Sequence, residues 1–160
     1  MIGRALGLPS DEIRELGFTG RVHDVGKMFV PERVLNKQNS LTEEEFDLLK
    51  VHPRLGGEIL STIPNGDRIR NAVESHHEYF DGSGYPTGLR GEEIPLWARI
   101  ITVADAYVNF TSERSLARGK TSEQAMSELE KSSGIKYDGM LVRILSRELK
   151  SERSLPNLGS

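Results

Sequence analysis

The sequence predicts an all-α domain. Apolar residues recur at helical spacing, as at Ile69, Val73 and His76, which share one face of a helix. A Thr followed three residues later by Glu or Gln is a capping box that begins a helix, and this pattern occurs at Thr42 and Thr121. No segment has the pattern of a strand convincingly.

The first helices are expected on either side of the Gly-Leu-Pro sequence near the N-terminus. Residues 1–8 form the end of one helix, and Ser10 is expected to cap a second helix that runs to about Gly26. Proline is accepted in the first turn of a helix, so Pro31 is expected to begin a short helical turn in the connector that follows.

Two further helices are expected to start at prolines. One helix is expected to begin at Thr42. Pro53 is expected to begin the next helix, which continues to Leu60, and His52 lies at the junction between the two. Pro95 is expected at the first position of a helix that reaches about Ser112.

The C-terminal part is expected to hold two more helices. Thr121 begins one, and Asp138 caps the last, which reaches about Leu149. We therefore expect one domain over residues 1–150 and a flexible tail over 151–160.

The composition is that of a globular chain of 160 residues, with 36% hydrophobic and 28% charged residues. A net charge of −3 argues against a DNA or RNA partner, which usually needs a basic face. The absence of cysteine excludes thiolate ligands and fits a reducing cytoplasm. No signal peptide and no apolar run of about 18 residues occurs, so we expect a cytoplasmic protein without a membrane segment.

All four histidines lie in short polar motifs. His23 is in VHDVGK, His52 is in VHP, and His76 and His77 are in VESHHEYFDGSGYPTGLRG. Adjacent helical residues point about 100° apart, so the neighbouring pair is better placed to serve two ions than one. A glycine-rich loop lets peptide N–H groups approach an anion closely. The segment indicates a phosphate ester handled by two metals, or else helix-end histidines before a surface turn.

Two further residues fit a charged site. Asp105 lies near the apolar face of its helix, where an unpaired carboxylate is costly and metal coordination would satisfy it. Lys27 lies one helical turn after His23 and places a cation on the same face. A helix end with His and Lys near the negative end of its dipole is the structural alternative.

Together these motifs resemble the HD-GYP family, the bacterial HD-type phosphohydrolases that cleave cyclic di-GMP. The similarity extends from about residue 2 to residue 149, in the family's order and spacing. The matching segments are HDVGK (23–27), HP (52–53), HHEYFDGSGYPTGL (76–89), GEEIPLWARI (91–100) and VAD (103–105). The resemblance implies an HD-domain-like bundle of about five to seven helices with a glycine-rich GYP loop.

The resemblance also implies a site with two divalent ions. Nitrogen and oxygen donors suit iron or manganese, with zinc as the alternative. The expected metal ligands are His23, Asp24, His52, His76, His77 and Asp105. The expected catalytic residues are Asp24, which would bridge the ions, and Lys27. Residues expected to orient the imidazoles or accept a proton are Glu78 and Asp81. The expected substrate-binding residues are Gly84, Tyr85, Pro86, Arg90, Arg99, Arg114 and Arg118, with Lys120 as a further cation.

The leading hypothesis is a phosphodiesterase that hydrolyses cyclic di-GMP to pGpG or GMP in bacterial second-messenger signalling. One alternative is a degenerate domain that binds metal, nucleotide or a protein without turnover. Another is an HD phosphohydrolase that acts on a different nucleotide.

Three departures from the family pattern bear on activity. The family's upstream histidine ligand precedes the start of this chain, Val108 replaces a second aspartate, and Arg114–Ala117 replaces an RPYR-like segment. We therefore expect weak catalysis from the chain as given. Apolar faces carrying Ile13 and Val22 are expected to pair neighbouring chains as a homodimer, and an upstream sensory or receiver domain is expected in the full protein.

Overall fold

The computed structural model describes residues 1–64, 66–112 and 119–154, and within these ranges it contains helices and loops but no strand. The all-α prediction is confirmed. The longer α-helices are α2 (Ser10–Val22), α4 (Glu43–Lys50), α5 (His52–Leu60), α6 (Asp67–Glu74), α7 (Leu96–Thr111), α8 (Ser122–Lys131) and α9 (Gly139–Ser154). Shorter elements are the α-helical turns α1 (Ile2–Ala5) and α3 (Glu32–Leu35) and the 3₁₀ helices η1 (Val25–Phe29) and η2 (Gly91–Glu93).

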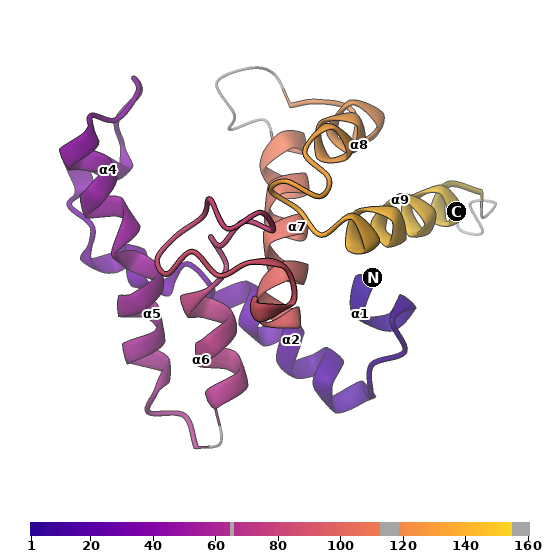
Figure 1. Cartoon of the computed structure of the whole chain (residues 1–160), viewed down its shortest axis with the longest axis horizontal. Helices are drawn as coiled ribbons and strands as arrows, with labels where there is room; N and C mark the ends of the chain where they lie inside the picture. The colour runs from indigo at the N-terminus through magenta and orange to yellow at the C-terminus, as the bar shows by residue number, and fades with distance from the viewer. Residues whose placement is uncertain (65, 113–118, 155–160) are drawn as a thin grey trace, which may run out of the picture.

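Helix α7 stands in the middle of the bundle (Figure 1). It packs against α6 on one side and against α8 and α9 on the other, while α5 packs against α6 and η1. Helix α1 contacts α9, and α2 contacts α6. Helix α4 lies at the outside, and none of its residues, all of which the structure describes, is buried. None of the described helices is long and apolar enough to cross a membrane.

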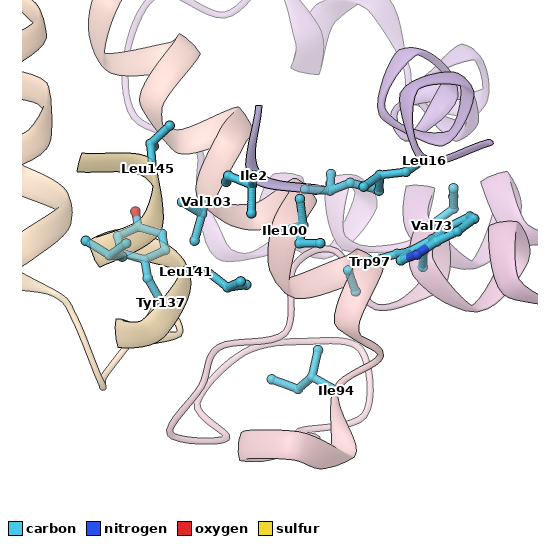
Figure 2. Close-up of a cluster of buried hydrophobic side chains, with 14 of the residues drawn as sticks. Ile2, Leu16, Val73, Ile94, Trp97, Ile100, Val103, Tyr137, Leu141 and Leu145 are labelled. Carbon is cyan, nitrogen blue, oxygen red and sulfur yellow. The ribbon is translucent and has the colours of Figure 1, made fainter. Parts of the chain in front are cut away.

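The main core is built around the apolar face of α7. Trp97, Ile100 and Val103 of this helix are buried together with Val73 of α6 and Leu141 of α9 (Figure 2). Burial of each such side chain stabilises the fold by roughly 1.5–3 kcal/mol. This core holds the end of α6 against α7, and so it fixes from behind the segment that carries the paired histidines.

The predicted helix starts are largely confirmed. Thr42 and Thr121 form capping boxes with Glu45 and Gln124. Asp138 accepts a hydrogen bond from the N–H of Met140 at 2.8 Å at the start of α9. Pro53 lies in the first turn of α5, directly after His52. Pro31 occupies the cap position before α3 rather than starting that helix.

The predicted end of α2 near Gly26 is wrong, because the helix stops at Val22. The ring Nδ1 of His23 donates a hydrogen bond to the carbonyl oxygen of Gly20, at a distance of 2.8 Å. A continuing α-helix would give the same carbonyl to the N–H of Asp24. The chain instead continues into η1.

Three other boundaries differ from the prediction. Ser10 is the first residue of α2 rather than its cap, because Pro9 occupies the cap position and no side chain caps the helix. Pro95 precedes α7 rather than starting it. Helix α9 continues past Leu149 to Ser154.

Arg99 joins the starts of α7 and α9. Its Nη1 donates to Asp138 Oδ2 at 2.7 Å, and its Nε donates to the carbonyl oxygen of Ile94 at 3.0 Å. The side chains of this ion pair are only 13% and 7% exposed. The guanidinium therefore joins two helix starts in the fold, and its expected contact with a substrate phosphate stays a prediction.

We expect Arg99→Leu to lower the free energy of unfolding by about 2 kcal/mol, because it leaves the buried Asp138 carboxylate without its charged partner. Urea unfolding measures this change. Arg54→Leu is the matched control, because Arg54 and Glu58 form an exposed ion pair on α5. The control should stay within about 0.5 kcal/mol of the parent, and equal losses in both variants would contradict the role given to Arg99.

An apolar groove of about 370 Å³ lies among α1, α2, α7 and α9. Ile13 and Val108 line it, whereas Val22 packs against the core. Pairing of chains through the Ile13 face stays a prediction.

Candidate metal centre

The close contact between η1 and α5 depends on Gly26. A Cβ at this position would overlap the carbonyl oxygen of His52 and lie 2.6 Å from the backbone nitrogen of Gly56. Glycine is therefore required for the two backbones to approach. This contact brings Asp24 and Lys27, on either side of Gly26, up to the start of α5.

Four of the predicted ligands converge on one point. One donor atom from each of Asp24, His52, His76 and His77 lies within 4.8 Å of the others. They come from the segment after α2, the first residue of α5 and the segment after α6. The Thr102 hydroxyl of α7 donates to the carbonyl oxygen of His76 at 2.7 Å, which fixes the last of these segments.

The other two predicted ligands flank this group. His23 Nε2 lies 3.5 Å from Asp24 Oδ2 and 3.7 Å from Asp105 Oδ1. Asp105 Oδ2 accepts a hydrogen bond from Asn109 Nδ2 at 2.8 Å. Asn109 was not among the predicted site residues, although its position four residues after Asp105 on one helix was a signal for this contact.

Three imidazole rings are held by backbone carbonyls in the same way. In each, Nδ1 lies close to the carbonyl oxygen three residues earlier. The pairs are His23 with Gly20 at 2.8 Å, His52 with Leu49 at 2.7 Å and His76 with Val73 at 2.6 Å. Because a carbonyl oxygen only accepts, Nδ1 carries the hydrogen, and in the neutral ring Nε2 carries the lone pair.

These lone pairs turn toward each other. His52 Nε2 and His76 Nε2 are 3.3 Å apart. Asp24 Oδ1 is 3.2 Å from the first nitrogen and 3.7 Å from the second. Lone pairs and a carboxylate oxygen this close repel one another unless a proton or a metal cation lies among them.

The carboxylate of Asp24 is held in its ionised form. Burial by itself raises its pKa, but hydrogen bonds to the carboxylate, among them that of the Lys27 ammonium, outweigh burial and hold the pKa well below its usual range. The Lys27 ammonium donates to Asp24 Oδ2 at 2.6 Å. Asp24 therefore presents Oδ1 to His52 and His76, and Oδ2 to Lys27 and His23.

Burial keeps the paired histidines neutral. It lowers the pKa of His76, and it lowers the pKa of His77 to about 2. Burial also lowers the pKa of His23, but the carboxylates of Asp105 and Asp24 outweigh it and leave that pKa above its usual value. A neutral imidazole is the form that binds a metal ion.

The donor set fits a divalent metal ion. Within the part of the chain that the structure describes, the buried atoms His23 Nε2 and Asp24 Oδ1 have no hydrogen-bond partner. Buried polar atoms rarely remain unpaired, because burial without a partner is costly. Imidazole nitrogen and carboxylate oxygen without sulfur suit iron, manganese or zinc.

Glu78, which follows the paired histidines, anchors the GYP loop rather than an imidazole. It is 1% exposed and accepts hydrogen bonds from the N–H and O–H of Thr87, both at 2.7 Å. The N–H of Gly88 donates to its second oxygen at 3.0 Å. Asp81 likewise bonds within the loop, to the N–H and O–H of Ser83. Glu78 and Asp81 were expected to act beside the imidazoles. In the structure their carboxylates instead accept hydrogen bonds from residues of the loop and fix its shape.

A cavity of about 230 Å³ opens beside the paired histidines. It combines aromatic rings with polar groups of α7. Its lining residues are His76, His77, Tyr79, Thr102, Asp105, Ala106, Asn109, Phe110 and Tyr137. Val108, which stands where the family pattern has a second aspartate, lines the apolar groove and not this cavity.

The expected substrate residues are placed unequally. Tyr85 stacks on His77, with ring centroids 4.8 Å apart, and Gly84 and Pro86 flank it in the loop. Arg90 is exposed beside η2, and Lys120 pairs with Glu128 at 3.2 Å. Arg114 and Arg118 lie outside the described residues.

The sequence profile of a family described as HD domain matches residues 1–141. A cyclic di-GMP phosphodiesterase response regulator, RpfG, of Xanthomonas campestris pv. campestris is 40% identical over 149 residues, which cover 92% of this chain and 39% of the relative. A cyclic di-GMP phosphodiesterase of Thermotoga maritima is 36% identical over 160 residues, which cover 98% of this chain and 42% of the relative. The chain thus spans about two fifths of the length of these relatives.

The chain is also similar to a relative named for a different cyclic dinucleotide and to two proteins of solved structure. A 3'3'-cGAMP-specific phosphodiesterase of Vibrio cholerae is 33% identical over 141 residues, covering 87% of this chain and 27% of the relative. The crystal structure of a cyclic GMP-AMP-specific phosphodiesterase of Vibrio cholerae has a TM-score of 0.71 at 22% identity, covering 95% of this chain and 42% of that one. An HDG"Y"P protein from Bdellovibrio bacteriovorus also has a TM-score of 0.71 at 22% identity, covering 93% and 48%. These two structures share the fold.

Proposed function

Because the chain belongs to the HD domain family and is homologous to HD-GYP cyclic di-GMP phosphodiesterases, we propose that it is a metal-dependent phosphodiesterase that hydrolyses cyclic di-GMP. The observation that carries the proposal is the convergence of Asp24, His52, His76 and His77 within 4.8 Å. The hydrogen bonds that turn the Nε2 atoms of His52 and His76 toward Asp24 support it further.

The donors divide naturally into two sets around Asp24. Its Oδ1, with the rings of His52, His76 and His77, would hold one divalent ion. Its Oδ2, with the donor atoms of His23 and Asp105, would hold a second. When bound, a divalent ion at these donors would supply Lewis-acid polarisation of a phosphoryl oxygen and would lower the pKa of a bound water.

The chain's own residues orient these donors and set the charge around them. The backbone carbonyls of Gly20, Leu49 and Val73 hold three imidazoles with Nε2 facing the site. The Lys27 ammonium fixes the orientation of the Asp24 carboxylate, and because its side chain is 37% exposed it is also accessible to a substrate phosphate. The cavity beside His76 and His77 offers aromatic faces to a base and Asn109 as a polar contact.

The proposed substrate is cyclic di-GMP, and hydrolysis of its phosphodiester bonds would give pGpG or GMP. Relatives include enzymes named for cyclic di-GMP and for 3'3'-cGAMP. Both are cyclic dinucleotides, so the two must be compared directly on this chain.

We expect the protein loaded with Mn²⁺ or Fe²⁺ to hydrolyse cyclic di-GMP, to lose this activity with a chelator and to regain it when metal is restored. Chromatography of the nucleotide products measures the reaction, with 3'3'-cGAMP and linear pGpG as parallel substrates. Tight binding of cyclic di-GMP without turnover in any metal would instead support the non-catalytic alternative. Faster turnover of 3'3'-cGAMP would reassign the substrate.

A further inference from the structure

His77 differs from the other three histidines in how its ring is held. The rings of His23, His52 and His76 each bond a backbone carbonyl. His77 has no hydrogen bond to its ring among the described residues. Its orientation must therefore come from packing.

Three rings surround His77, and Tyr85 is the parallel one. The ring planes of Tyr85 and His77 are 22° apart with centroids at 4.8 Å. The rings of His52 and His76 meet it at 81° and 43°. Because rotation of the imidazole about its bond to Cβ would break the parallel contact, the tyrosine ring limits that rotation.

Backbone contacts of the loop hold Tyr85 next to His77. The N–H of Tyr85 donates to the carbonyl oxygen of His77 at 3.1 Å. At Gly84, a Cβ would lie 2.6 Å from the Cα of Glu78 and would also collide with the backbone nitrogen of Tyr79. The buried Glu78 carboxylate holds the far limb of the loop. These contacts account for a glycine immediately before the tyrosine.

Tyr85 is also supported from α4. The ring of Phe46 meets it edge-on, with centroids 5.9 Å apart and an angle of 82° between the planes. The Tyr85 hydroxyl has no hydrogen-bond partner among the described residues. Among the described residues, the contacts of the Tyr85 side chain are therefore those of its ring.

We propose that Tyr85 is a positioning residue that sets the orientation of the His77 imidazole through the face of its ring, and that its hydroxyl is not needed for this. The role of His77 as a metal ligand rests on the function proposed above. Tyr85 touches no reacting atom in this role, since it acts through His77.

The test compares Tyr85→Phe, which keeps the ring, with Tyr85→Leu, which removes it. The first readout is the set of imidazole resonances of His77 in the metal-free protein by NMR. The second is Mn²⁺ affinity by calorimetry. We expect Tyr85→Phe to match the parent in both, whereas Tyr85→Leu should displace the His77 resonances and weaken Mn²⁺ binding by about 10-fold, as loss of a ligand-orienting partner commonly does.

Phe18→Leu is the control for loss of an exposed aromatic ring, because Phe18 lies on α2 and is 36% exposed. It should leave both readouts unchanged. Phe46→Leu removes the support behind Tyr85 from a helix without buried residues, so it can be measured even if Tyr85→Leu fails to fold. We expect a smaller change in the same direction.

Two results would overturn the proposal. One is an equal loss of Mn²⁺ affinity in Tyr85→Phe and Tyr85→Leu, which would assign the effect to the hydroxyl. The other is parent-like His77 resonances in Tyr85→Leu, or in Phe46→Leu if only that variant folds. Failure of the parent protein to bind Mn²⁺ or cleave cyclic di-GMP would instead contradict the proposed function, since the metal-free spectra test the ring stack by themselves.

Discussion

Replacement of Asp24 by alanine is expected to abolish metal binding and, with it, hydrolysis of cyclic di-GMP. Asp24 reaches both sets of donors, because Oδ1 faces His52 at 3.2 Å and Oδ2 faces His23 at 3.5 Å. Loss of an outer partner of a ligand commonly weakens affinity about 10–100-fold, so loss of the shared ligand should exceed about 100-fold. Elemental analysis after dialysis and calorimetry with Mn²⁺ measure the change.

Asp67→Ala is the matched control for Asp24→Ala. Asp67 lies in the first turn of α6, its side chain is 81% exposed, and it pairs with Arg70 at 3.1 Å. Its removal should change neither metal content nor activity. Unchanged metal stoichiometry in Asp24→Ala would eliminate the arrangement in which Asp24 bridges two ions.

Gly26→Ala is expected to lower both the stability of the fold and the metal affinity. The added methyl group would overlap the carbonyl oxygen of His52, and backbone cannot move aside as a flexible side chain can. Such overpacking costs typically about 1–3 kcal/mol, and here we expect about 3 kcal/mol because both obstructing groups are backbone. Separation of η1 from α5 would also carry Asp24 away from His52. Urea unfolding and Mn²⁺ calorimetry measure the two effects.

Gly17→Ala provides the contrasting glycine substitution. Gly17 lies inside α2, and the nearest group to a Cβ there is the Arg21 guanidinium at 3.9 Å. Alanine should raise the free energy of unfolding by about 0.5–1 kcal/mol, because glycine is unfavourable inside a helix. If Gly26→Ala unfolded at the same urea concentration as the parent and bound Mn²⁺ equally well, the close approach would have no role in the site.

Features that depend on near neighbours in the chain could be predicted from the amino-acid sequence. The capping boxes at Thr42 and Thr121 and the Asp138 cap act over two or three residues, so their helix starts were predictable. The helical spacing of Ile69 and Val73 identified a buried face for the same reason. The short motifs around the four histidines also indicated which side chains to consider for a metal site.

Features that depend on segments far apart in the chain became visible only in the folded structure. Arg99 was expected to hold phosphate, but Asp138, 39 residues away, binds its guanidinium in the interior. Glu78 was expected beside the imidazoles, but the returning limb of the loop brings Thr87 to its carboxylate. Local spacing carries no information about such partners, because they meet only when the helices pack.

The same distinction holds inside the candidate site. The histidine motifs indicated which residues could be donors. Packing of η1 on α5 at Gly26 brings Asp24 to His52, and the core around α7 holds the paired histidines in place. The end of α2 at Val22 follows from capture of a backbone carbonyl by His23, which helical propensity does not describe. A metal site requires atoms from several segments at short range, so its residue types can be predicted from sequence while its geometry arises only from the packed fold.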